Sequence, residues 1–149
     1  ILSALNPPAL KESSIQVLIS ELCASFQKTS GIECKANFTD DFSSVDLNEE
    51  EKLNIFRIVQ ESLTNIQKHT NAKTAQVIFR TSSNGKKGYV FFICDDGCGF
   101  DTSHPVSSKD KANHFGLKSI SQRAQLLGGS LKVTSEIGGG TNIRIEVRK

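Results

Sequence analysis

The hydrophobic positions in the first part of the chain predict one amphipathic helix followed by one strand. Apolar residues recur every three or four positions over residues 15–26, which is the spacing of one helix face, and Gly31 is placed to end that helix. Residues 32–38 alternate between apolar and polar side chains. This alternation is typical of a strand with one buried face.

A second, longer helix is predicted from Asn48 to about His69. Asn48 and the acidic residues after it have the pattern of a capping box, and negative charge in the first turn suits the helix dipole. The pattern gives this helix one polar face and one apolar face. The apolar face consists of Leu53, Phe56, Val59, Leu63 and Ile66.

The second half of the chain predicts two strand pairs and one further helix. The pairs are 75–79 with 89–94 and 131–133 with 143–147, joined by an Asn-Gly turn and by a run of three glycines. A helix over residues 117–127 lies between the pairs and ends at two glycines. The expected fold is an α+β two-layer sandwich with a mixed, mostly antiparallel sheet and three helices on one face.

Composition predicts one domain without nucleic-acid or direct membrane contacts. The 149 residues suffice for one core, and Lys and Arg are interleaved with acids, which argues against a nucleic-acid partner. No apolar run reaches transmembrane length, and the four cysteines lack the paired spacing of a zinc site. The chain starts at Ile1 and contains no Met, so we expect a piece of a longer protein. Two adjacent prolines separate a linker over residues 1–10 from a domain over residues 11–149.

The polar face of the second helix carries candidate site residues. Glu61 and Asn65 are one turn apart and therefore share a face, and Lys68 and His69 follow them. An amide oxygen suits Mg²⁺, a carboxylate can orient or deprotonate a nucleophile, and the two basic residues can neutralise phosphate. For an isolated helix, a solvated face with i,i+4 charge pairs is the alternative.

Three glycine-containing segments are the other candidates. Asp95 ends a buried strand, where a carboxylate can accept from an exocyclic amine, and Gly97 and Gly99 let a planar base approach the backbone. Residues 114–117 stand at a helix start, where free backbone N–H groups can cradle phosphate. Thr141 follows two glycines at the start of a strand. Taken singly, the first segment can be an ordinary loop, and the other two are better explained as a plain loop-to-helix junction and a plain hairpin.

Together, the four segments resemble the nucleotide-binding boxes of a known family. QESLTNIQKH, DDGCG, HFGL and GGT, in this order and at these separations, resemble the N, G1, G2 and G3 boxes of GHKL-type ATPase domains. The resemblance covers nearly the whole chain and is strongest to the catalytic domain of bacterial two-component sensor histidine kinases. FRIVQESLTNIQKHTNA and NHFGLKSISQRAQLLGGSLKV are similar to the branch of nitrate/nitrite sensors and desaturase-controlling thermosensors.

This resemblance implies a Bergerat fold that binds ATP and Mg²⁺ between the second helix and a lid loop over residues 101–115. Glu61 would polarise or deprotonate the nucleophile, and Asn65 would contact Mg²⁺. Asp95 would bind the adenine amino group, directly and through a water that Thr141 supports. The other residues expected to bind ATP are Lys68, His69, Gly97, Gly99, His114, Phe115, Gly116 and Leu117.

The resemblance also implies partners. The γ-phosphoryl group would pass to a histidine on an upstream dimerisation domain of a homodimeric parent protein, and then to an aspartate of a response regulator. The implied setting is a cytoplasmic domain of a membrane-anchored parent. His114 stands where larger kinases have the first glycine of the G2 box, and none of the three histidines has the setting of a phosphoacceptor. Two alternatives stay open, a serine kinase of the anti-sigma-factor type and a degenerate module that binds without transfer.

Overall fold

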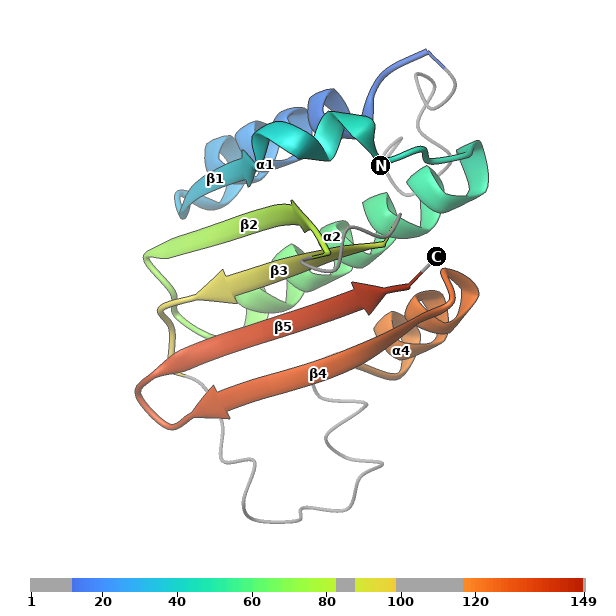
Figure 1. Cartoon of the computed structure of the whole chain (residues 1–149). Coiled ribbons are helices and arrows are strands. Elements are labelled where there is room, and N and C mark those ends of the chain that lie inside the picture. The colour runs from blue at the N-terminus through green and yellow to red at the C-terminus, as the bar shows by residue number, and fades with distance from the viewer. Residues whose placement is uncertain (1–11, 83–87, 99–116, 149) are drawn as a thin grey trace.

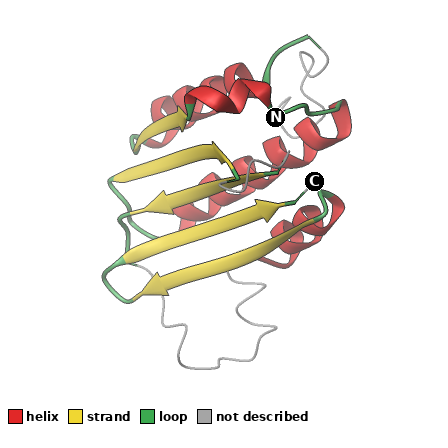
Figure 2. Cartoon of the chain, in the orientation of Figure 1, coloured by secondary structure: helices red, strands yellow, loops and turns green. Residues whose placement is uncertain are grey.

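In the part of the chain that the structure describes, one five-stranded sheet forms one layer and three α-helices form the other (Figures 1 and 2). The computed structural model describes residues 12–82, 88–98 and 117–148. The strands are β1 (Glu33–Phe38), β2 (Thr74–Thr81), β3 (Tyr89–Asp95), β4 (Gly129–Glu136) and β5 (Gly140–Val147). Their order in the sheet is β1-β2-β3-β5-β4, with β1 parallel to β2 and all other neighbours antiparallel. The expected two-layer α+β fold with a mixed sheet is therefore confirmed.

The helices begin and end at the capping residues that the sequence provides. They are α1 (Ile15–Ser30), α2 (Glu49–His69) and α4 (Leu117–Leu126), with a short 3-10 helix, η2 (Asp40–Ser44). Gly31 ends α1 in the left-handed conformation, with φ of 77°. At the start of α2, the Asn48 side chain accepts from the Glu51 N–H at 2.8 Å, and the Glu51 carboxylate accepts from the Asn48 N–H at 3.4 Å. The predicted capping box is confirmed. Within the described ranges, no helix has both the length and the apolar character of a membrane span.

The inner face of the sheet, which packs against the helices, consists of apolar rows that cross the strands. Paired residues on neighbouring strands place their side chains on the same face of a sheet. One row contains Val77, Ile93, Ile143 and Val133, and the next contains Phe79, Phe91, Ile145 and Leu131. Phe79 and Phe91 are fully buried and stack with ring centroids 4.8 Å apart. A slip of one residue would expose these side chains, so the rows fix the register of the central strands.

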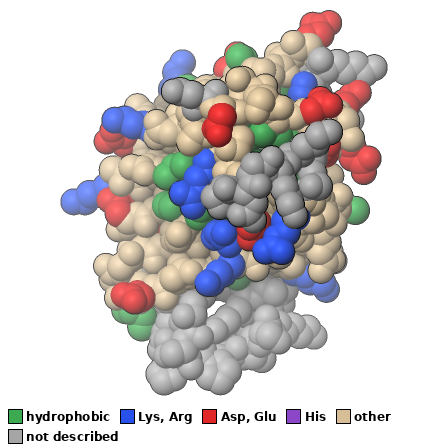
Figure 3. Space-filling view, in the orientation of Figure 1, with side chains coloured by type: hydrophobic (Ala, Val, Ile, Leu, Met, Phe, Trp, Pro, Cys, Tyr) green, Lys and Arg blue, Asp and Glu red, His purple; other side chains and the backbone are tan. Residues whose placement is uncertain are grey.

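No described helix covers the opposite face of the sheet, which is the face toward the viewer in Figures 1 and 3. Lys and Arg side chains gather over its middle (Figure 3). Arg80 and Arg144 lie over the Phe92 ring, with guanidinium carbons 4.9 and 5.9 Å from its centroid. Arg144 also pairs with Glu146 at 3.4 Å. The strands are thus amphipathic, and their inner face supplies the core.

Candidate functional site

A polar row crosses the inner face of the sheet at one end, where the apolar rows stop. Asp95 pairs with Thr141, and Thr141 pairs with Ser135, so the three side chains lie on the helix-facing side of adjacent strands. Ser135 is buried, and its hydroxyl oxygen lies 2.9 Å from that of Thr141. At this end, the helix-facing side of the sheet therefore presents one carboxylate and two hydroxyls directly after the apolar rows.

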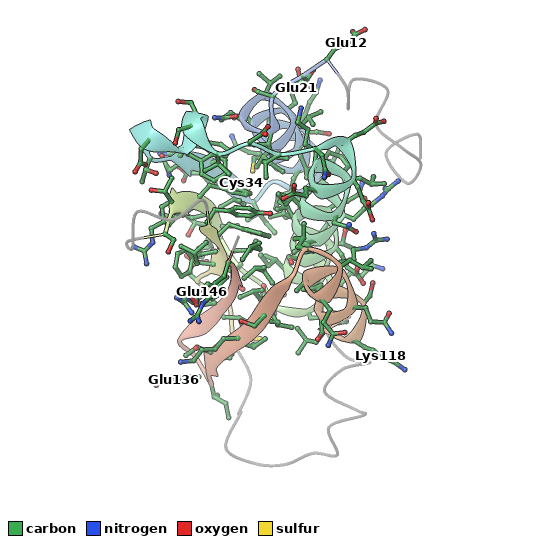
Figure 4. The ribbon with its side chains drawn as sticks, turned by 45° about the vertical axis from the view of Figure 1, so that its right-hand side comes forward. Glu12, Glu21, Cys34, Lys118, Glu136 and Glu146 are labelled. Atoms are coloured by element: carbon green, nitrogen blue, oxygen red, sulfur yellow. The ribbon has the colours of Figure 1, made fainter. Side chains whose placement is uncertain are left out.

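A cavity of about 320 Å³, measured together with its opening, lies between this polar row and α2. Its lining residues are Ser62, Asn65, Ile66, Thr70, Ile93, Asp95, Leu117, Thr141 and Ile143. Glu136 and Lys118, the chain neighbours of Ser135 and Leu117, mark this end of the molecule in Figure 4. Aliphatic walls with a few polar groups are typical of a small-molecule site.

Asp95 is the carboxylate of this cavity. Its Oδ1 accepts a hydrogen bond from the Gly97 N–H at 2.7 Å. Burial raises the pKa of the Asp95 carboxyl above its ordinary value, against the opposing effect of the Gly97 N–H. An ionised carboxylate accepts hydrogen bonds and cannot donate them. Asp95 is therefore suited to bind an amino group of a ligand in the cavity.

The adjacent Asp96 has a different role. It is exposed, and its Oδ1 accepts from the backbone N–H groups of Lys73 and Thr74 at 2.9 and 3.0 Å. The N–H groups of Thr74 and Lys73 hold the pKa of the Asp96 carboxyl below its ordinary value. Asp96 thus ties the turn after β3 to the start of β2, while Asp95 lines the cavity.

Two glycines let the backbone approach the Asp95 turn more closely than any side chain would allow. A Cβ at Gly97 would overlap the Thr70 carbonyl oxygen and lie 2.5 Å from the Thr70 Cβ. A Cβ at Gly140, where φ is 81°, would overlap the Asp95 carbonyl oxygen. The Cys98 N–H donates to the Thr70 carbonyl at 2.7 Å. We expected a glycine at position 97 because it would admit a planar base, and this stays a prediction. The structure gives a separate reason for glycine there, because the turn packs against the end of α2.

The predicted polar residues of α2 differ in their relation to the cavity. Asn65 lines it, and Glu61 is half-buried one turn earlier. Lys68 is exposed and His69 is half-buried at the C-terminal end of the helix. The His69 carbonyl accepts from the Cys98 Sγ at 3.5 Å, which adds a contact between α2 and the turn after β3. The structure therefore brings Asn65 together with Asp95 and Thr141 in the lining of one cavity, and their roles in binding stay predictions.

Part of the predicted site lies outside the described residues. This holds for the predicted lid over residues 101–115 and for four predicted binding residues, Gly99, His114, Phe115 and Gly116. Leu117, the last residue of that predicted phosphate cradle, begins α4 and lines the cavity. It thereby places the start of α4 at the same cavity as Asp95 and Thr141.

Two hydroxyl residues that were not predicted also line the cavity, namely Ser62 on α2 and Thr70 directly after its last residue. Ser62 donates to the Ile58 carbonyl and Thr70 to the Ile66 carbonyl, each at 2.7 Å and four residues back along the helix. The sequence offered one signal for Ser62, because it stands next to Leu63 on the apolar side of a helix. A hydroxyl there is either bonded to its own helix or directed at a ligand.

The chemistry of the donor groups is compatible with a Mg²⁺ ion bound together with nucleotide phosphates. The described residues contain no group of three His, Cys, Asp or Glu that could hold a metal ion. Mg²⁺ is usually held by one or two protein oxygens together with substrate phosphates and water. The Asn65 side chain, which lines the cavity, carries an amide oxygen of the kind that such a site would use.

Comparison with known proteins shows the family of this chain. The family model described as histidine kinase-, DNA gyrase B-, and HSP90-like ATPase matches residues 50–149. Over 147 residues, the chain is 31% identical to an uncharacterized sensor-like histidine kinase of Chloroflexus aurantiacus. It is 29% identical over 147 residues to the sensor histidine kinase LiaS of Bacillus subtilis, and 30% identical over 147 residues to the sensor histidine kinase ComP of the same organism. These alignments cover 99%, 99% and 96% of this chain, but 24%, 38% and 18% of the relatives.

Solved structures of histidine kinases share the fold. A blue-light activated histidine kinase of Erythrobacter litoralis superposes with a TM-score of 0.68 at 22% identity, over 93% of this chain and 43% of that one. The Acinetobacter baumannii histidine kinase AdeS gives a TM-score of 0.65 at 11% identity, over 89% of this chain and 63% of that one. The family model covers most of the chain, so the chain belongs to the histidine kinase-, DNA gyrase B- and HSP90-like ATPases, as the ATP-binding catalytic domain of a sensor histidine kinase. It spans well under half the length of each curated relative named here.

Proposed function

We propose that the cavity between α2 and the polar row of the sheet holds the adenine of ATP. Asp95 accepts from the exocyclic amino group, directly and through a water that the Thr141 hydroxyl supports. Gly97 and Gly99 leave room for the base beside the backbone. The observation that carries this assignment is the half-buried carboxylate of Asp95, which is bonded to the Gly97 N–H and placed among aliphatic walls.

The phosphates extend from this cavity along α2 toward the start of α4. Asn65 contributes an oxygen to Mg²⁺, which supplies charge neutralisation for the phosphates when bound. Glu61, one turn earlier on the same helix face, orients or deprotonates the nucleophile. Basic groups and helix-start N–H groups hold the phosphate oxygens, and the residues assigned to this role are Lys68, His69, His114, Phe115, Gly116 and Leu117.

The γ-phosphoryl group passes to a histidine on an upstream dimerisation domain and then to a response regulator. Residues 1–10 form the end of a dimerisation helix or its linker, and residues 11–149 form the catalytic domain. The parent is a homodimer anchored in the membrane, with this domain on the cytoplasmic side and without nucleic-acid or membrane contacts of its own. Within the kinases, it belongs to the branch of nitrate/nitrite sensors and desaturase-controlling thermosensors. The family and the motif wording of the sequence support these assignments.

Two measurements test this function. The chain should bind ATP with Mg²⁺ by calorimetry, but it should accumulate no acid-labile, base-stable phosphate from labelled ATP. Adding the helical dimerisation domain of the parent protein as a separate polypeptide should produce that phosphate on the added domain. The Asp95→Ala variant should be inactive in the mixture. Phosphohistidine on the catalytic chain alone, or phosphoserine on the partner, would contradict the proposal.

A further inference from the structure

Ser135 on β4 is a buried hydroxyl to which neither the family resemblance nor the proposed function gives a role. It is 6% exposed, and among the eight residues of β4, all of them described, it alone is buried. Leu131 and Val133 lie on the same face of this edge strand and are only half-buried. A buried hydroxyl lowers stability unless its hydrogen bonds are made, so its contacts indicate what it does.

Ser135 contacts two groups of β5. Its hydroxyl donates to the Gly140 carbonyl at 3.0 Å and lies 2.9 Å from the Thr141 hydroxyl oxygen. A carbonyl can only accept, and a serine hydroxyl has one proton. Thr141 is therefore the donor in the second contact. Its proton is directed at β4, and its lone pairs remain available to a ligand in the cavity.

We propose that Ser135 is a positioning residue that makes the Thr141 hydroxyl an acceptor toward the cavity, so that the site selects a purine with a 6-amino group. The inference rests on the proposed adenine site, because Thr141 pairs with Asp95 across β5 and β3. Asp95 also only accepts while it is ionised. Two neighbouring acceptors favour a ligand amino group and oppose a carbonyl at the same position. Ser135 acts through Thr141 and does not touch the base.

The test compares ATP with inosine triphosphate, which carries a carbonyl where adenine carries the 6-amino group. Dissociation constants are measured by calorimetry with Mg²⁺ for the 149-residue chain and its variants. Ser135→Ala should lower the preference for ATP about fivefold, the factor that one ordinary hydrogen bond controls. Most of this change should be tighter binding of inosine triphosphate, because the released Thr141 proton can then be donated to the carbonyl.

Two further variants control for simple loss of a hydroxyl. Ser130 is exposed on the opposite face of the same strand, so Ser130→Ala should leave the preference unchanged. Ser135→Thr keeps the hydroxyl and should keep the preference for ATP shown by the unsubstituted 149-residue chain. Loss of the preference in either variant would overturn the positioning role.

A double-mutant cycle shows whether Ser135 acts through Thr141. In a Thr141→Val background, Ser135→Ala should change the preference no further, because no Thr141 hydroxyl is left to orient. Equal weakening of both nucleotides in Ser135→Ala, with a lower melting temperature, would show a purely structural role and overturn the inference. An unchanged preference would also overturn it and leave the proposed function standing. Failure of the unsubstituted 149-residue chain to bind ATP would overturn both this inference and the proposed function.

Discussion

Gly140 offers a direct test of how β5 supports Asp95. Its φ is 81°, and a Cβ there would overlap the Asp95 carbonyl oxygen, lie 3.0 Å from the Asp95 carbonyl carbon and lie 3.2 Å from the Asp96 Cα. Gly138, in the same β-turn region, has nearly the same φ of 79°, but a Cβ there would have no atom within 4 Å. The two alanine variants therefore share the backbone strain and differ in the steric overlap.

The structure gives a magnitude for each variant. Left-handed backbone costs alanine about 1–2 kcal/mol, and the stiffer unfolded chain offsets about 0.4–1 kcal/mol of this cost. Gly138→Ala should therefore lower the free energy of unfolding by about 1 kcal/mol. Gly140→Ala must also separate β3 from β5 locally, since carbon atoms pack at about 3.5–4.0 Å. The loss of one or two hydrogen bonds of about 1 kcal/mol each brings the total to roughly 3 kcal/mol.

Urea unfolding measures the two free energies, and calorimetry with ATP measures the functional consequence. Gly140→Ala should weaken ATP binding because it displaces the backbone that carries the Asp95 carboxylate, whereas Gly138→Ala should leave ATP binding close to that of the parent chain. Equal destabilisation of the two variants would refute the argument, because the overlap with Asp95 would then have no energetic consequence.

Three further predictions concern the carboxylates and the amide. Asn65→Ala should weaken Mg²⁺-dependent ATP binding about tenfold or more, with a small change in melting temperature. If calorimetry shows the same Mg²⁺ dependence for the variant and for the unsubstituted chain, Asn65 is not a metal contact. Asp96→Ala should lower the free energy of unfolding by about 1 kcal/mol by removing the acceptor for the Lys73 and Thr74 N–H groups. Because the folded-state pKa of Asp96 is lowered, this difference should be constant above about pH 4 and shrink only as the pH falls further, and a difference that grows toward low pH in urea titrations would contradict it. Burial raises the pKa of Asp95, so ionisation of its carboxyl opposes folding as the pH rises. The melting temperature of Asp95→Asn should therefore be higher than that of the unsubstituted chain at pH 7, and the two should converge near about pH 4. The same variant should bind ATP more weakly.

Local sequence signals were sufficient to predict the helices and two of the polar groups at the cavity. The Asn48–Glu51 capping box and the left-handed Gly31 depend on residues a few positions apart, so the sequence predicts them directly. Asp95 and Asn65 were identified by their positions at a strand end and on a polar helix face. The structure brings both to one cavity, although their roles in binding are still proposals.

The remaining features depend on which strands become neighbours. Ser135 is an ordinary serine in the sequence, and it acquires a role only because β4 pairs with β5 in the register that places it opposite Thr141. Thr70 and Gly97 are 27 positions apart, and their contact depends on how the turn after β3 packs against the end of α2. Hydrophobic periodicity describes one element at a time, so it does not specify such contacts.

The central claim, that Asp95 binds the adenine amino group, is tested most directly by the ratio of the dissociation constants for ATP and GTP. Guanine carries a carbonyl where adenine carries the amino group, and an unpaired buried acceptor costs roughly 1–3 kcal/mol, which corresponds to a preference for ATP of about tenfold or more. The unsubstituted chain and the Asp96→Ala variant should show this preference, and the Asp95→Ala variant should lose most of it. If Asp95→Ala keeps the preference and Asp96→Ala loses it, the adenine contact belongs to Asp96 and the account of the site is wrong.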